Sequence, residues 1–191
     1  MTSEPGSAVD RLLTLSLFAA PLIYLLADSL YAARGWDDPT AAIFHVLGAI
    51  AYTFVLLRVV TWSDGVLAAV LLFIGAVGVA GNVAYGFNTI HVSLGDTNLV
   101  DATGAATLIR PLGLCFPLML LLTALAIRRT RRVWISVGLA VAAIAWPVAH
   151  IANIAWLAVV VNAALVVVFG ALAVAVPRVA ADPAKAPVGV A

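Results

Sequence analysis

The chain has 191 residues, of which 64% are apolar and 10% are charged, and its formal net charge is +1. An ordinary soluble domain is about 45–50% apolar and about 25% charged, so this composition excludes a soluble globular domain and indicates a protein embedded in the lipid bilayer of a cell membrane. The near-zero net charge offers no field that would attract nucleic acid. A single cysteine excludes an intrachain disulfide and any zinc motif built on cysteine pairs.

Six apolar runs follow one another along the chain, and each is long enough to cross the hydrocarbon core as a helix. The predicted spans are residues 12–33, 41–61, 66–90, 107–127, 133–150 and 154–176. Residues 1–11 are expected to form a cytoplasmic N-terminal segment, and residues 177–191, rich in proline and alanine, a disordered cytoplasmic tail. The predicted fold class is therefore an all-α integral membrane protein, a bundle of six transmembrane helices.

Turn-forming residues separate most of these spans. Pro39 suits the first turn of a helix, and Ser63-Asp64-Gly65 predicts a tight turn between spans two and three. The break between spans five and six is the least marked, because residues 133–176 carry no charge. This stretch is too long for one span, and its most polar part, residues 150–153, is the predicted break.

Basic residues predict the orientation of the bundle, since cytoplasmic loops are enriched in lysine and arginine. The arginine cluster at residues 128–132 is expected to be cytoplasmic. Counting spans from this cluster places both termini in the cytoplasm as well. All three histidines of the chain, and Asp28 within span one, then fall towards the outer ends of their spans.

Helical spacing places polar residues of different spans on single faces in this outer half. The predicted ligand-binding residues are Tyr24, Asp28, His45, Tyr52, Asn82 and Tyr85, with Arg110 at the mouth. The inner half is nearly pure alanine, valine, leucine and glycine, and Gly75 and Gly78 allow close helix contact there. This asymmetry predicts a polar cup that opens outwards and is closed below, rather than a channel with polar lining along its length.

The histidines suggest two further kinds of site. His45, His91 and His150 are candidate ligands of zinc or another transition metal, although their spacing is non-local. His45 and His150 are also a candidate axial pair for heme b. The alternative is that each histidine donates a hydrogen bond to a loop carbonyl at the membrane interface.

Asp28 and His45 are the candidate catalytic residues. A desolvated carboxylic acid among tyrosines is a suitable general acid, for instance for acid-initiated isoprenoid cyclisation. The structural alternative is a partly buried ion pair between Asp28 and Arg110 that fixes helix register.

The leading functional hypothesis is a non-catalytic one. It describes a small polytopic membrane protein whose outward-facing cup binds a small hydrophobic or amphipathic ligand, or a partner. The alternative is a membrane-embedded enzyme that uses Asp28 and His45, with metal, with heme or by acid catalysis alone. A third hypothesis is a small transporter, which the apolar inner half disfavours. The sequence leaves open the identity of the ligand and the oligomeric state.

Overall fold

The computed structural model describes residues 6–128 and 133–175. The predicted tail at 177–191 and most of the arginine cluster at 128–132 lie outside the described residues. Within the described part, the chain forms six long helices and two short 3-10 helices. The elements are α1 (Ala8–Arg34), α2 (Pro39–Val60), α3 (Gly65–Ser93), η1 (Leu99–Asp101), η2 (Gly104–Leu108), α4 (Ile109–Ile127), α5 (Val133–Ile151) and α6 (Ala155–Val174).

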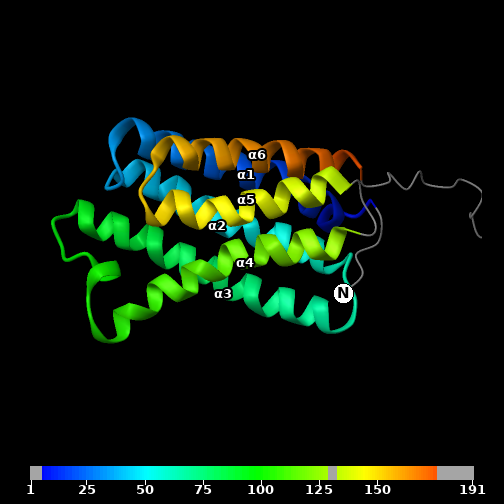
Figure 1. Ribbon diagram of the computed structural model, residues 1–191, viewed down its shortest axis with the longest axis horizontal. Coiled ribbons are helices and arrows are strands. Elements are labelled where there is room, and N and C mark those ends of the chain that lie inside the picture. Colours follow the sequence, from blue (N-terminus) through cyan, green and yellow to red (C-terminus); the bar gives the residue numbers. More distant parts are fainter. Residues whose placement is uncertain (1–5, 129–132, 176–191) are drawn as a thin grey trace, which may run out of the picture.

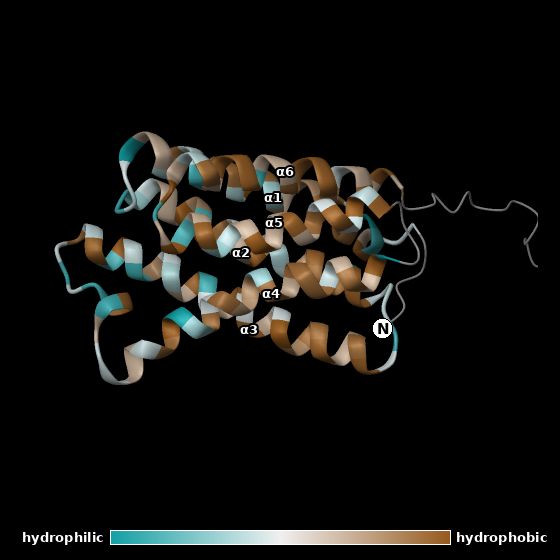
Figure 2. Cartoon of the chain, viewed as in Figure 1, coloured by the Kyte–Doolittle hydropathy of each residue, from teal (hydrophilic) through white to brown (hydrophobic). Residues whose placement is uncertain are grey.

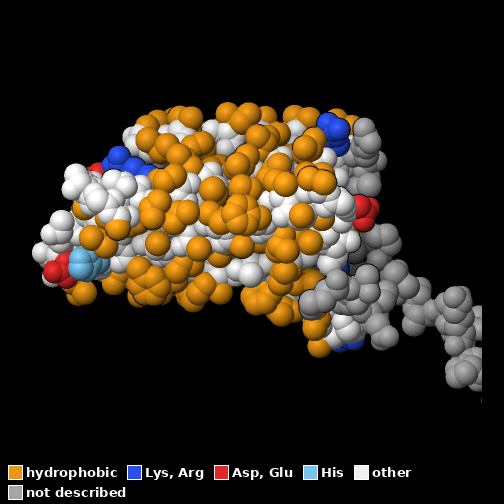
Figure 3. Space-filling model, turned by 90° about the horizontal axis from the view of Figure 1, so that it is seen from below, with side chains coloured by type: hydrophobic (Ala, Val, Ile, Leu, Met, Phe, Trp, Pro, Cys, Tyr) orange, Lys and Arg blue, Asp and Glu red, His pale blue; other side chains and the backbone are white. Residues whose placement is uncertain are grey.

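Each of the six predicted spans coincides with a long helix of the structure, and the ends agree to within about one turn. Each long helix has the length and the composition needed to cross a membrane, if η2 and α4 are taken together as Gly104–Ile127. The lateral surface of the bundle is accordingly apolar, whereas charged side chains gather at its two ends (Figures 2 and 3). Phe73, Val141 and Val167 are more than 60% exposed on this surface. Such a belt suits contact with lipid chains and would be costly in water.

Local residue chemistry explains where the helices begin and end. Gly35, with φ of 99°, ends α1 by donating its N–H to the Tyr31 carbonyl at 2.9 Å. The Asp38 carboxylate caps α2 by accepting from the Ala41 N–H at 2.7 Å, and Pro39 opens that helix as predicted. The weakly marked break before α6 is confirmed, and Asn153 adopts a positive φ of 53° there.

The helices are arranged as a ring. Each long helix packs against its neighbours in the chain, and α6 packs against α1, which closes the ring (Figure 1). Three connections lie at one end of the bundle, namely residues 35–38, 94–108 and 152–154, and we call this the pocket end. The described chain begins and finishes at the opposite end.

Four rings fill the middle of the bundle and form an aromatic plug of Tyr24, Tyr52, Phe116 and Phe169. Each of these side chains is fully buried. Tyr24 stacks on Phe116 with centroids 5.4 Å apart, and Tyr52 meets Phe116 edge-on at 4.9 Å. Tyr52 also contacts Tyr24 and Phe169. The plug joins four helices and separates the pocket end from the apolar half of the bundle.

Candidate functional site

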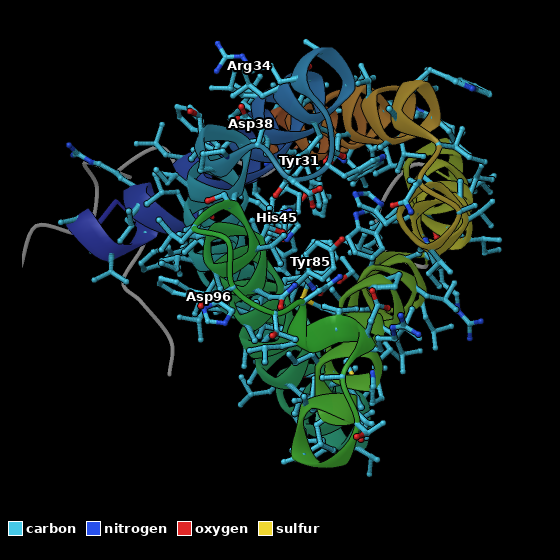
Figure 4. All side chains as sticks on the ribbon, turned by 90° about the vertical axis from the view of Figure 1, so that its left-hand side faces the viewer. Tyr31, Arg34, Asp38, His45, Tyr85 and Asp96 are labelled. Carbon is cyan, nitrogen blue, oxygen red and sulfur yellow. The ribbon has the colours of Figure 1, made fainter. Side chains whose placement is uncertain are left out.

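A cavity of about 540 Å³ opens at the pocket end. It lies between the ends of α2, α3, α4 and α5 and the loops that join the helices. Figure 4 looks onto this end and shows Tyr31, His45 and Tyr85 around the centre of the ring, with Arg34 and Asp96 farther out. The wall contains both rings and polar groups: Trp36, His45, Asn82, Tyr85, Asn88, Thr89, Trp146 and His150, with Asp37, Asp101 and Arg110 towards the rim.

One side of the cavity is built on a chain of hydrogen bonds that joins α1, α2, α3 and α4. The Asn82 side chain donates to the carbonyls of Gly78 and Gly113 at 2.9 and 3.2 Å. Its oxygen accepts from the Tyr24 hydroxyl at 3.1 Å. The Tyr24 oxygen lies 3.4 Å from Nε2 of His45. All three side chains are at least 99% buried, so the network is shielded from water and holds the His45 ring in one orientation.

The other side holds Asp28, which α5 and α6 supply with partners. Asn162 of α6 donates to Asp28 Oδ2 at 2.6 Å. Nε2 of His150 in α5 lies 3.2 Å from the same oxygen, within ion-pair distance, although the angle falls short of a hydrogen bond. Since Nδ1 of His150 donates to the Trp146 carbonyl at 2.9 Å, a favourable contact at Nε2 requires one proton shared between the imidazole and the carboxylate.

Aromatic rings enclose His150. The Trp146 ring stacks on it with centroids 3.9 Å apart and an interplanar angle of 18°. Trp36 approaches it edge-on at 5.9 Å and donates a hydrogen bond to the Asn153 carbonyl at 3.3 Å. The α1–α2 loop is thereby tied to the α5–α6 turn. These contacts leave His150 facing the cavity beside two indole rings.

The rim is shaped by the connection between α3 and α4. Asn88 of α3 donates to Asn98 at 2.9 Å and accepts from the Leu99 N–H at 2.7 Å. Asn98 donates to Asp101 at 2.8 Å, and Asp101 forms an ion pair with Arg110. This long connection is therefore pinned to the body of the protein and gives the cavity a fixed edge.

The structure brings some of the predicted ligand-binding residues to the cavity and places others behind its wall. His45, Asn82, Tyr85 and Arg110 line the cavity. Tyr24 supports the wall by its contacts with His45 and Asn82, and Tyr52 belongs to the aromatic plug. Asp28 lies behind the wall and touches it through His150, one of the lining residues.

The alternative ion pair between Asp28 and Arg110 is not found. Arg110 pairs with Asp101, because the connection before α4 brings a nearer carboxylate to it, and Asp28 is instead held by α5 and α6. Asp28 therefore connects the first third of the chain to the last third, and it makes no ion pair with Arg110 of α4.

The three candidate metal ligands lie in different surroundings. His91 is partly exposed and pairs with Asp96 at 3.3 Å, whereas His45 and His150 line the cavity. Within residues 6–128 and 133–175, no group of three or more metal-binding side chains is close enough to hold an ion. For a heme, His150 would have to turn Nε2 away from Asp28 before it could bind iron.

Sequence reasoning did not assign the roles of Trp36, Trp146 and Asn162. Tryptophans near the ends of a span most often anchor it at the membrane interface, so the positions of these two tryptophans did not indicate a site. Asn162 carried a usable signal, since it is the single amide inside the last apolar run. Its partner Asp28, 134 positions away in the chain, could not be predicted from the sequence.

Several buried polar atoms around the cavity have no hydrogen-bond partner among the described residues. They are Asp28 Oδ1, Tyr31 Oη, His45 Nδ1, Tyr52 Oη, Trp146 Nε1, His150 Nε2 and Asn162 Oδ1. Buried polar atoms are paired in the great majority of cases, and a small molecule or ordered water is the usual partner when protein groups are absent. All but one of the unpartnered buried atoms in the described part of the chain lie in this half of the bundle, the exception being Arg58 Nε at the opposite end, so this region is the candidate site.

No protein-family model, no curated protein and no solved structure matches this chain.

Proposed function

We propose that this polytopic membrane protein binds a small hydrophobic or amphipathic ligand in the cavity at its pocket end, without chemical conversion. The observation that carries the proposal is a cavity of about 540 Å³ whose wall contains aromatic rings and three residues with a buried nitrogen that is unpartnered among the described residues, namely His45, Trp146 and His150. Small-molecule sites are typically concave and mostly apolar, with a few polar groups that fix the orientation of the ligand.

The proposed cup opens on the outer face of the cell membrane, with both termini in the cytoplasm. Support comes from the five described arginines, of which Arg11, Arg58 and Arg128 lie at the opposite end of the bundle and Arg34 and Arg110 at the pocket end. The aromatic plug also supports a cup rather than a transporter, because it fills the bundle axis below the cavity with fully buried rings.

Filling the cavity is the direct test. A side chain at Gly113, which lines the cavity, would meet no atom within 4 Å at its Cβ, so Gly113→Phe adds a ring without a clash at that atom. Binding of a set of fluorinated aromatic fragments would be measured by fluorine NMR on the full chain in lipid nanodiscs. We expect some fragments to bind the unaltered protein, and Gly113→Phe to weaken them by on the order of ten-fold or more, about 1.4 kcal/mol.

The matched control is Leu118→Phe, which adds bulk on the same helix at a side chain that is 42% exposed on the lateral surface. Fragment binding should survive this change. If no fragment binds, or if both variants weaken binding equally, the cavity is not a ligand site and the proposal fails.

A second candidate function, acid catalysis within the membrane, is favoured by one observation. The Asp28 carboxyl group is 99% buried, lies 3.2 Å from Nε2 of His150 and keeps Oδ1 free of partners among the described residues. A buried acid of this kind can donate its proton to a substrate. A carboxylic-acid band in the infrared spectrum that disappears in Asp28→Asn would support this candidate, and a carboxylate band would oppose it.

A further inference from the structure

The hydrogen-bond chain beneath the cavity fixes the direction in which each group donates. Carbonyl oxygens can only accept, so the Asn82 group that lies 2.9 Å from Gly78 O and 3.2 Å from Gly113 O is its NH₂. The side-chain oxygen of Asn82 therefore faces Tyr24. The Tyr24 hydroxyl has one hydrogen, and this hydrogen is donated to Asn82 Oδ1 at 3.1 Å.

His45 is next in the chain, and its tautomer follows from the same argument. Because the Tyr24 hydrogen is already used, the contact of 3.4 Å between the Tyr24 oxygen and His45 Nε2 is favourable when Nε2 carries the hydrogen. A neutral imidazole has a single N–H group, so Nδ1 of His45 then carries a lone pair. No carboxylate in the described part of the chain lies within ion-pair distance of His45, which is consistent with the neutral ring.

Nδ1, which carries the lone pair, lies on the side of the ring that faces away from α3. The Cδ2 edge of His45 lies against Gly86 of α3, and Nδ1 is on the opposite side of the ring, across Cγ. His45 is 99% buried and lines the cavity, yet Nδ1 has no partner among the described residues. The rings of Tyr85 and Tyr31 flank it, with centroids 5.7 and 6.2 Å away.

We infer that the ligand of this cavity is a neutral molecule with a hydroxyl group on a flat ring, and that this hydroxyl donates a hydrogen bond to Nδ1 of His45. The inference rests on the proposed function and specifies its ligand class. The fixed lone pair of His45 selects a donor, and the aromatic wall of Tyr85 and Trp146 accommodates the ring.

Other ligand classes fit this arrangement less well. A ketone, an ether or a carboxylate would place a second acceptor against the lone pair and leave both unpaired. An ammonium ion would require a free carboxylate at this depth, whereas Asp28 is engaged by His150 and Asn162, and Asp101 by Arg110.

Two probes of nearly equal size test the donor requirement. Para-fluorophenol carries the hydroxyl, and para-fluoroanisole carries a methyl ether in its place. Dissociation constants would be measured by fluorine NMR on the full chain in nanodiscs, with empty nanodiscs subtracted. We expect the phenol to bind about five-fold tighter or more, which is the range of one net hydrogen bond. Equal binding of the two probes, or tighter binding of para-fluorobenzylammonium, overturns the inference.

Variants assign the preference to His45. His45→Gln should abolish it, because glutamine places its terminal group near the position of Nε2 and leaves the position of Nδ1 empty. His91→Gln is the matched control and should retain the preference, since His91 does not line the cavity and is paired with Asp96. If His45→Gln does not fold, Tyr24→Phe serves instead, because it removes the hydroxyl that sets the tautomer.

A second measurement needs no ligand. Nitrogen NMR of the histidine-labelled chain distinguishes the two neutral tautomers, and we expect His45 to carry its hydrogen on Nε2. A hydrogen on Nδ1 overturns the inference. Failure here is separable from failure of the proposed function: fragments that bind in a manner sensitive to Gly113→Phe, but without preference for a hydroxyl, leave the cavity as a ligand site and reject only the donor requirement.

Discussion

A close contact between the backbones of α3 and α4 makes Gly78→Ala an informative single change to the fold. Gly78 lies on α3 against the backbone of α4. A methyl carbon at this position would lie 2.5 Å from the amide nitrogen of Phe116 and 2.6 Å from the carbonyl carbon of Cys115. These atoms belong to the backbone, so no side-chain rotation can relieve the contact.

The size of the effect follows from this geometry. Favourable contacts between non-bonded heavy atoms lie at about 3.5–4.0 Å, so α3 and α4 would have to separate by about 1 Å. Overpacking typically costs about 1–3 kcal/mol, and a backbone contact belongs at the upper end. Alanine recovers about 0.5–1 kcal/mol of helix propensity over glycine. We therefore expect Gly78→Ala to lower the free energy of unfolding by about 2 kcal/mol.

The separation would also reach the candidate site. Asn82 of α3 donates to the Gly113 carbonyl of α4 at 3.2 Å, and an increase of about 1 Å breaks this bond. The Asn82 amide would then be free to turn, and the order of donors through Tyr24 to His45 would be lost. Weaker fragment binding should accompany the loss of stability.

The assay is reversible unfolding in mixed detergent micelles, followed by circular dichroism. Gly113→Ala is the control, because a methyl group there would meet no atom within 4 Å, and this variant should be as stable as the unaltered chain or slightly more stable. If Gly78→Ala proves as stable as Gly113→Ala, the close approach of α3 and α4 is not part of the fold in the membrane, and the reasoning is refuted.

Two further predictions concern the polar pair and the orientation. Asn162→Ala removes the donor that lies 2.6 Å from Asp28 Oδ2, and we expect it to lower the free energy of unfolding by about 1–3 kcal/mol. A double-mutant cycle with Asp28→Ala measures the coupling between the two side chains. If the losses of stability are independent and additive, the contact is contradicted. The orientation is tested by cysteine labelling in a Cys115→Ala background. Asp37→Cys should react with a membrane-impermeant maleimide from outside the cell, whereas Asp64→Cys should react only after the cells are permeabilised. The reverse labelling pattern would show that the proposed orientation is inverted.

The six helices were predictable because each span carries its own evidence. Length and apolar composition decide whether a segment crosses a bilayer, and both are local properties of the sequence. Gly35 and Pro39 mark the first turn by their own backbone preferences, and the structure confirms that turn. Helical spacing also assigned His45 and Asn82 to faces directed at the bundle interior, and both are buried there.

The partners of the polar residues were not predictable in the same way. Spacing gives the face of a helix, but it does not give the neighbour that this face meets. Asp28 was placed against Arg110 in the structural alternative, and it meets Asn162 and His150 because α6 closes the ring on α1. Tyr52 shares a helix face with His45, yet it lies deeper and packs into the aromatic plug.

The sequence by itself determined that this protein is a bundle of six long apolar helices suited to span a membrane, with most of its buried polar groups towards one end, because hydrophobicity and helical period are local properties of the sequence. The tertiary structure alone decided which of those groups meet. The order of the helices around the ring and their rotation depend on close contacts, such as that of Gly78 with the backbone of α4. Those contacts place His45 in the wall of the cavity and Asp28 behind that wall.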